Sequence, residues 1–292
     1  MQWSDLVAWE EQYGPINDVQ PLTPLQQGLV FHTELDAEHG VDAYLTQTVL
    51  RFTGAIDPER MRHAVQTTLE HYPNLKASIV TNTSGEYVSV IPATVEVPFT
   101  VVDVAGSDDF ETTVTDHADS QRAMPFILTQ PPLLRGVLIQ NHDRDRNALI
   151  LTAHHSLLDG WSATPLITYL LQSYRRPSQA PQANKAYTQF LEWHENRDRS
   201  ESESAWSAVL STLESPSIVA PGVRNIGTHP ESFKFSIKKE VNEALTALAQ
   251  TAGATLSTLV QAAWGVFLNT ITGQETVVFG TTVSGRPAEI DG

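Results

Sequence analysis

The stretch LTAHHSLLDGWSATP, residues 151–165, decides the fold and carries the candidate site of this chain. It ends an almost continuous apolar run that begins near residue 147, and such a run predicts a strand buried on both faces. In α/β folds, functional sites lie at the carboxyl ends of central strands. His154 and His155 stand at that end, and an aspartate and a glycine follow shortly after. The stretch therefore predicts either a functional site or a strand end that carries buried imidazoles.

Neighbouring residues of a strand point to opposite faces of the sheet. We therefore expect His154 and His155 to point apart, with no shared metal ion; one imidazole should be structural and the other should face a cavity. Asp159 follows across a tight turn and could orient His155, cap a helix or form a buried ion pair. Gly160 lets the backbone bend, and its N–H could approach a substrate oxygen.

The chain offers a histidine base but no evident covalent nucleophile. It has no cysteine, which excludes disulfides, zinc–thiolate sites and a cysteine nucleophile. It also contains no G-x-S-x-G nucleophile elbow, no phosphate-binding P-loop and no dinucleotide-binding G-x-G-x-x-G. The chemistry that fits these residues is direct acyl transfer assisted by a general base.

Length and charge narrow the class of protein further. The 292 residues suffice for one large or two modest domains. A net charge of −16 argues against nucleic acid and anionic lipid as partners. No apolar run approaches the ~20 residues of a membrane span, and the N-terminus lacks the pattern of a signal peptide. We expect a cytoplasmic, monomeric protein with no nucleic-acid or membrane partner.

Helix and strand patterns alternate along the first 175 residues. Thr23, Pro24 and Gln26 form the start of a helix with a capping box, and Asp57 with Pro58 starts another. The other predicted elements are a strand over residues 44–54, hairpins over 76–92 and 132–155, and a helix from Ser162 to about residue 174.

The segment RRPSQAPQANKA, residues 175–186, loses this periodicity and predicts a domain boundary. Beyond it the patterns favour an amphipathic helix over residues 187–210, helices over 240–253 and 255–273, and strands over 232–240 and 276–287. Together these elements place the chain in the α/β class, in its α+β variety.

Five motifs, in order, resemble those of the condensation domains of nonribosomal peptide synthetases. HHSLLDG (residues 154–160) matches the HHxxxDG signature of that family, whereas the shorter HxxxD pattern also occurs in coenzyme A-dependent acyltransferases of the same fold. The other four motifs are PLTPLQQGLVFH (21–32), HYPNLKASI (71–79), YTQFLEW (187–193) and VVFGTTVSGRP (277–287). The resemblance covers essentially the whole chain.

This resemblance implies two chloramphenicol acetyltransferase-like lobes, each with a mixed sheet and flanking helices. Residues 1–20 would link to an upstream carrier domain and residues 21–175 would form the N-terminal lobe. Residues 176–292 would form only part of the C-terminal lobe, because family members continue through two more motifs. In the family a tunnel between the lobes holds the histidine motif, so we expect this chain alone to be weakly active or inactive.

The resemblance also implies a reaction and its partners. An upstream donor carrier domain and a downstream acceptor carrier domain present thioesters on phosphopantetheine arms, and the acceptor amine attacks the donor thioester to form a peptide bond. An adenylation domain is expected next to the condensation domain. No metal or diffusible cofactor is implied, and the products of such synthetases include antibiotics and other secondary metabolites.

The resemblance assigns roles by position. His155 is the active-site histidine, and His154 and Asp159 are structural, with Asp159 expected to hold an arginine. Gly160 would line the donor side, with its N–H near the thioester oxygen. The remaining candidates are Trp161, Ser162 and Ser284 for substrate binding, and Arg135 and Lys76 as ion-pair partners of Asp159.

Two motifs depart from the family pattern. His71 and Lys76 stand where the family usually has arginines. A lysine would pair with an aspartate as a point charge and not as a bidentate fork. Gln189 replaces the usual aspartate of the aromatic motif YTQFLEW.

LLDGWS (residues 157–162) and the opening motif resemble the branch that accepts a donor ending in a D-configured residue, since the L-donor branch more often has a serine before the aspartate. Three other functions stay open: an epimerisation domain, a coenzyme A-dependent acyltransferase of free small molecules, and a non-catalytic recruitment domain. An epimerisation domain would use a second-lobe glutamate that this sequence does not reveal. Recruitment domains usually lose the histidine motif.

Overall fold

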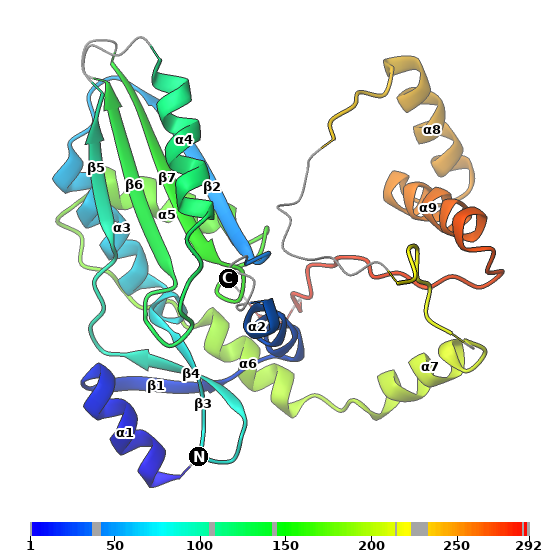
Figure 1. The fold of residues 1–292 in the computed structure, drawn as a ribbon, viewed down its shortest axis with the longest axis horizontal. Coiled ribbons are helices and arrows are strands. Elements are labelled where there is room, and N and C mark those ends of the chain that lie inside the picture. The colour runs from blue at the N-terminus through cyan, green and yellow to red at the C-terminus, as the bar shows by residue number, and fades with distance from the viewer. Residues whose placement is uncertain are drawn as a thin grey trace. The chain divides into compact units, whose positions relative to one another are not determined.

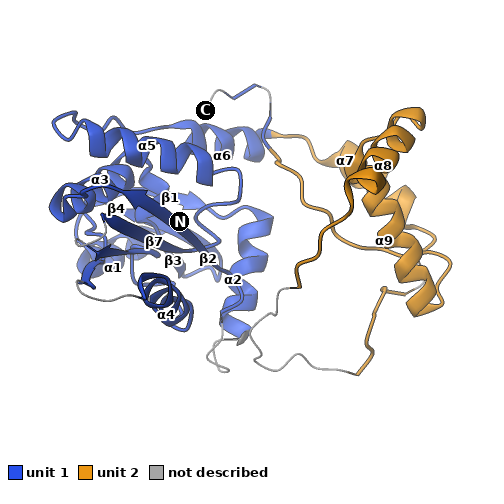
Figure 2. Ribbon diagram, turned by 90° about the horizontal axis from the view of Figure 1, so that it is seen from above, with its two compact units in different colours: residues 1–196, 286–292 blue, residues 197–285 orange. Residues whose placement is uncertain are grey.

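The computed structural model describes residues 2–36, 42–104, 109–141, 145–213, 215–222, 233–287 and 289–290. The chain divides into two compact units, the first formed by Met1–Asn196 with Arg286–Gly292 and the second by Arg197–Gly285 (Figure 2). The first unit runs past the predicted boundary at residue 175. The reason is helix α6 (Ala186–Asn196), whose Leu191 is buried and whose Thr188 hydroxyl accepts a hydrogen bond from the Gln20 amide at 3.2 Å.

A mixed four-stranded sheet forms the centre of the first unit (Figure 1). Its strand order is β2-β7-β6-β5, with β5 and β6 parallel and the other pairs antiparallel. The strands are β2 (Leu45–Thr53), β5 (Phe99–Asp103), β6 (Leu134–Asn141) and β7 (Arg146–His154). The predicted β6–β7 hairpin is confirmed, and so is the buried, central position of β7; the hairpin tip at residues 142–144 lies outside the described residues.

Helices cover both faces of this sheet (Figure 1). The side chains of β7 alternate between the two faces. Leu149, Leu151 and Ala153 pack in one core with α3 and α5, whereas Ala148 and Ile150 pack in a second core with α4. The helices are α3 (Pro58–His71), α4 (Phe110–Arg122) and α5 (Ala163–Arg175). Continued past Ala153, this alternation directs the two neighbouring imidazoles to opposite faces.

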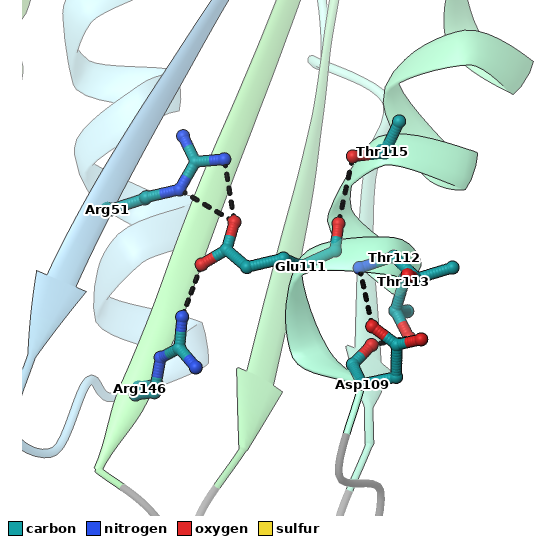
Figure 3. Close-up of polar contacts among 7 residues, drawn as sticks. All are labelled: Arg51, Asp109, Glu111, Thr112, Thr113, Thr115 and Arg146. Atoms are coloured by element: carbon teal, nitrogen blue, oxygen red, sulfur yellow. Dashed lines mark hydrogen bonds and ion pairs between the residues drawn. The ribbon is translucent and has the colours of Figure 1, made fainter.

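Helix α4 is tied to β2 and β7 (Figure 3). The contacts lie at the end of the sheet where Thr53 pairs with Arg146, opposite the end where Leu45 pairs with His154. Glu111 accepts hydrogen bonds from Nη2 and Nε of Arg51 on β2, at 2.9 and 3.1 Å, and forms an ion pair with Arg146 at the start of β7. Asp109 caps the helix by accepting a hydrogen bond from the Thr112 N–H at 3.1 Å. These contacts align α4 with the two strands and so support the sheet that carries the histidine motif at its other end.

A three-stranded antiparallel sheet, in the order β1-β4-β3, forms the other part of the first unit. The elements here are α1 (Trp3–Tyr13), β1 (Ile16–Pro21), α2 (Pro24–Asp36), the 3-10 helix η2 (Pro73–Lys76), β3 (Ser78–Thr81) and β4 (Tyr87–Pro92). The predicted β3–β4 hairpin is confirmed. The predicted capping box of α2 is also confirmed, because Thr23 and Gln26 exchange backbone-to-side-chain hydrogen bonds of 2.9 and 3.3 Å.

The segment predicted as a linker, residues 1–20, forms α1 and most of β1 and packs on this second sheet. β1 pairs with β4, and Trp9 packs against Val80 and Val90. Asp5 is buried and accepts hydrogen bonds from the N–H and the hydroxyl of Thr83 at 3.1 and 3.2 Å. These contacts make the segment part of the lobe, and its connection to a carrier domain stays a prediction.

The second unit contains the helices α7 (Ser200–Leu210), α8 (Lys239–Thr251) and α9 (Leu256–Thr272). All three lie where helices are predicted, although the helix predicted over residues 187–210 is divided into α6 and α7. The two predicted strands do not form: residues 233–238 and 275–287 are irregular, and residue 232 lies outside the described residues. A strand needs a hydrogen-bonded neighbour, and the described part of this unit contains no other strand, so Phe233 and Phe235 stay exposed.

Within the described residues, no single helix has both the length and the apolar content needed to cross a membrane. Helices α8 and α9 reach those limits only when taken together, and the pair bends by 98° at the break between them.

Candidate functional site

His155 lies just beyond the end of β7, with Nδ1 anchored and with Nε2 lacking a hydrogen-bond partner among the residues that the structure describes. Its backbone N–H donates to the Tyr44 carbonyl at 2.7 Å, which continues the β2–β7 pairing. Its Nδ1 lies 2.9 Å from the Leu158 carbonyl oxygen. A carbonyl only accepts hydrogen bonds, so the proton of the neutral ring is on Nδ1 and the lone pair is on Nε2. The half-buried ring thus presents Nε2 as a base or hydrogen-bond acceptor.

His154 has the opposite arrangement and is completely buried. Its Nδ1 accepts hydrogen bonds from the N–H and the hydroxyl of Ser156, at 3.2 and 2.7 Å. The ring proton is therefore on Nε2, which lies 3.0 Å from the Thr33 hydroxyl and 3.6 Å from the Asp42 carboxylate. Both nitrogens of His154 are thus engaged inside the protein, and this ring has a structural role.

Burial governs the charge of His154. Desolvation of the imidazolium lowers the pKa of His154 and outweighs the attraction of Asp42, which acts in the opposite direction. His154 is therefore neutral at pH 7.

Among the residues that the structure describes, no three histidine, aspartate or glutamate side chains come close enough together to hold a metal ion.

Asp159 is the centre of a polar cluster that closes the histidine loop. Its carboxylate forms a bidentate ion pair with Arg286, at 2.9 and 3.0 Å, and accepts hydrogen bonds from the N–H and hydroxyl of Ser162, at 2.8 and 2.6 Å. Partial burial opposes ionisation of Asp159, but the hydrogen bonds from Arg286 and Ser162 outweigh it and hold the pKa of the carboxyl well below its usual range. Of the three roles open to Asp159, the geometry fits the ion pair, although the pair is partly exposed and not buried as predicted. The Leu158 carbonyl, and not Asp159, orients His155.

The cluster predicts a dependence of stability on acid pH. Because the pKa of Asp159 is lower in the folded protein than its unfolded value of ~3.9, its contribution to the free energy of unfolding is complete above about pH 5. It begins to fall near pH ~3.9 and is lost as the pH drops toward the lower pKa of the folded state. The Asp159 side chain is 38% exposed, so we expect this contribution to the free energy of unfolding to be only about 1 kcal/mol. Urea unfolding at pH 7 and pH 3 should therefore show a smaller acid loss in Asp159→Asn than in the unmodified chain. An equal loss, or the same change in Asp116→Asn on α4, would contradict this assignment.

A family model described as "Condensation domain" matches residues 16–292. The chain belongs to the condensation domain family. A linear gramicidin synthase polypeptide from Brevibacillus parabrevis is 29% identical over 95% of this chain, and bacitracin synthase 1 of Bacillus licheniformis is 28% identical over 95%. The matched segments make up 6% and 5% of those proteins, so this condensation domain chain spans only a small part of its curated relatives.

The fold comparison agrees with the family. The first condensation domain of the calcium-dependent antibiotic synthetase, solved with a substrate analogue, superposes with a TM-score of 0.67 and 23% identity. The superposition covers 88% of this condensation domain chain and 62% of that one. The predicted fold class, a chloramphenicol acetyltransferase-like mixed α/β lobe, is confirmed.

Neither cation named as a candidate partner of Asp159 reaches it. Lys76 is buried and donates to Glu70 and to the Ala93 carbonyl at 3.1 and 3.0 Å. Arg135 pairs across the sheet with Thr152, and its guanidinium donates to the side chain of Gln121 at 2.7 Å. This contact holds the Arg135 guanidinium at the end of α4.

Arg286 was not predicted as the partner of Asp159, although it stands in the quoted motif VVFGTTVSGRP. The arginine in that motif is the feature of the sequence that could have indicated an ion-pair partner for Asp159. The two residues are 127 positions apart, so no local pattern connects them. Thr33 and Asp42, the partners of His154, carry no comparable signal in the sequence, because nothing local marks them as neighbours of β7.

The candidate substrate-binding residues are spread over both units. Ser162 directly precedes α5, as predicted, but its hydroxyl donates to Asp159 and accepts from Arg286, and it does not cap the helix. Trp161 is 47% exposed. Gly160 is exposed, and a Cβ atom built on it would meet no other atom within 4 Å. Ser284 belongs to the second unit and is exposed.

Proposed function

We propose that this condensation domain joins a donor acyl or peptidyl thioester to the amine of an acceptor aminoacyl thioester, forming a peptide bond. The observation that carries the proposal is the protonation geometry of His155: Nδ1–H donates to the Leu158 carbonyl and Nε2 presents a lone pair. Family membership supports the same reaction, and the relatives named above are synthases of peptides.

In the proposed reaction, Nε2 of His155 accepts the hydrogen bond of the acceptor amine and takes its proton as nitrogen attacks the thioester carbonyl. The Leu158 carbonyl stabilises the positive charge that develops on the ring, because it already accepts the Nδ1 proton. The tetrahedral intermediate then collapses: the C–S bond breaks, the amide remains, and the thiol leaves with the transferred proton. A base of this kind contributes roughly 10²–10⁴-fold.

Gly160 is proposed to face the donor thioester, with its N–H directed at the developing oxyanion. The open space around Gly160 supports this role. The backbone at Gly160 has no positive φ and no close neighbour that would itself require a glycine, so the fold does not explain the residue. Trp161, Ser162 and Ser284 are proposed to contact substrate. Asp159 and Arg286 are proposed to hold the loop in place.

We propose an upstream donor carrier domain and a downstream acceptor carrier domain as partners, each with its substrate on a phosphopantetheine arm, and a neighbouring adenylation domain. A cytoplasmic location and a donor ending in a D-configured residue belong to the same proposal. The sequence LLDGWS, which lacks a serine directly before the aspartate, supports the D-donor.

The test uses this chain extended through the remainder of its second lobe and two loaded carrier domains. The donor carries a dipeptide ending in a D- or an L-residue, and intact-protein mass spectrometry follows transfer to the acceptor. We expect elongation of the D-donor, faster than the L-donor by about tenfold or more. Elongation of the L-donor alone would retain the reaction and refute the stereochemical preference. Carriers that bind without transfer would refute the reaction and favour a recruitment role.

The same assay tests the rival reactions and the fragment. Acylation of a free small molecule from coenzyme A would indicate an acyltransferase, and inversion at Cα of a single carrier-bound residue would indicate epimerisation. Residues 1–292 alone should transfer slowly or not at all, because the proposed tunnel requires two complete lobes. Equal rates for the fragment and the extended chain would contradict that expectation.

A further inference from the structure

The side chain of Gln26 connects three of the five motifs. It lies in the first turn of α2, within the opening motif. Its Oε1 accepts hydrogen bonds from the Thr23 N–H at 2.9 Å and from the hydroxyl of Tyr187, in the aromatic motif, at 3.0 Å. Its Nε2 donates to the carbonyl of Ser156, in the histidine motif, at 2.8 Å. One amide thus joins segments separated by 130 and 161 residues.

The partners fix the orientation of this amide. The Thr23 N–H can only donate and the Ser156 carbonyl can only accept, so Oε1 must face Thr23 and Nε2 must face Ser156. A rotation by 180° would break both hydrogen bonds. Tyr187 adds a third contact that suits the same orientation.

The anchored carbonyl lies in the middle of the loop that orients both imidazoles. Ser156 is buried, and its N–H and hydroxyl hold Nδ1 of His154. Two residues later the Leu158 carbonyl holds Nδ1 of His155. Because the loop is so short, the position of the Ser156 carbonyl constrains the position of the Leu158 carbonyl.

We propose that Gln26, oriented by Tyr187, is a positioning residue that keeps the Leu158 carbonyl against Nδ1 of His155 and so keeps the lone pair on Nε2. Its effect on catalysis rests on the proposed condensation reaction. Its effect on the loop and on the tautomer of His155 does not.

Gln26→Glu separates this role from helix capping. A carboxylate still accepts from Thr23 and Tyr187, but it presents an oxygen to the Ser156 carbonyl and repels it. Gln27→Glu is the matched control, because Gln27 is the next residue of the same turn and its Nε2 also donates to a backbone carbonyl, that of Leu22, at 3.0 Å. Both variants lose one such hydrogen bond, and only Gln26→Glu loses it from the histidine loop.

The first readout is independent of the reaction. In residues 1–292 at pH 8, the ¹⁵N shifts of His155, assigned with His155→Gln, should show the Nδ1–H tautomer in the unmodified chain and in Gln27→Glu. A clear shift toward the Nε2–H tautomer is expected in Gln26→Glu. An unchanged tautomer in Gln26→Glu would overturn the proposal even if the condensation assay proves inactive.

The second readout uses the extended chain and loaded carriers. We expect kcat to fall by about 10–100-fold in Gln26→Glu, with KM for the carriers changed less than about twofold. Gln27→Glu should stay within about threefold of the unmodified chain, and Tyr187→Phe should lie between the two. Equal kcat values for the two glutamate variants would refute the positioning role, whereas inactivity of every chain including the unmodified one would count only against the condensation reaction.

Discussion

Replacement of His155 with glutamine should lower the rate of peptide-bond formation by about 10²–10⁴-fold in the extended chain. Glutamine retains a hydrogen-bonding side chain of similar reach but has no basic nitrogen, so it removes the lone pair that Nε2 presents. The ring is only half-buried, so the free energy of unfolding should change by less than about 1 kcal/mol. Single-turnover transfer between loaded carriers and urea unfolding measure the two quantities.

The substitution removes a base from the reaction and leaves the surfaces that bind the carrier domains unchanged. Carrier binding should therefore be equal in the unmodified chain and in His155→Gln. A variant that retains a third or more of the rate would show that His155 is not the base. A variant that loses activity together with several kcal/mol of stability would assign the residue a structural role instead.

Replacement of the neighbouring His154 with leucine should act mainly on stability, and we expect it to lower the free energy of unfolding by about 2–4 kcal/mol. The ring is fully buried between Thr33, Asp42 and Ser156. Without it, the Ser156 N–H and the Asp42 carboxylate lose a buried partner, and leucine cannot replace either contact. Urea unfolding of residues 1–292 at pH 7.5 gives the value directly.

The same residue sets a dependence of stability on pH. Burial lowers the pKa of folded His154 below the unfolded value of ~6.5, so the folded protein binds fewer protons than the unfolded chain as the pH falls below 6.5. Stability is complete above that pH and declines with acidification. This part of the decline should be absent in His154→Leu and present in His117→Leu, a control on α4. Equal stability of His154→Leu and the unmodified chain would refute the structural assignment.

Patterns local in sequence predicted much of the first unit. The apolar run before His154 predicted a central strand, because a strand covered on both faces has few polar residues. Alternation along that strand predicted that the two imidazoles point apart, and Thr23 with Gln26 predicted the start of α2. Each of these predictions depends on residues that lie within a few positions of one another in the sequence. The two strands predicted beyond residue 230 did not form, because a strand also needs a distant neighbour that local pattern does not supply.

By itself, then, the sequence determined the family, the mixed α/β lobe and the histidine loop as the candidate site, since these depend on motifs and short-range periodicity. Only the tertiary structure decided that Arg286 is the partner of Asp159 and that Arg135 and Lys76 are bound elsewhere. It also decided the tautomers of His154 and His155 and the junction at Gln26. Hydrogen bonds and ion pairs are effective only within a few ångströms, and the chain reaches those distances between residues far apart in sequence only when it folds.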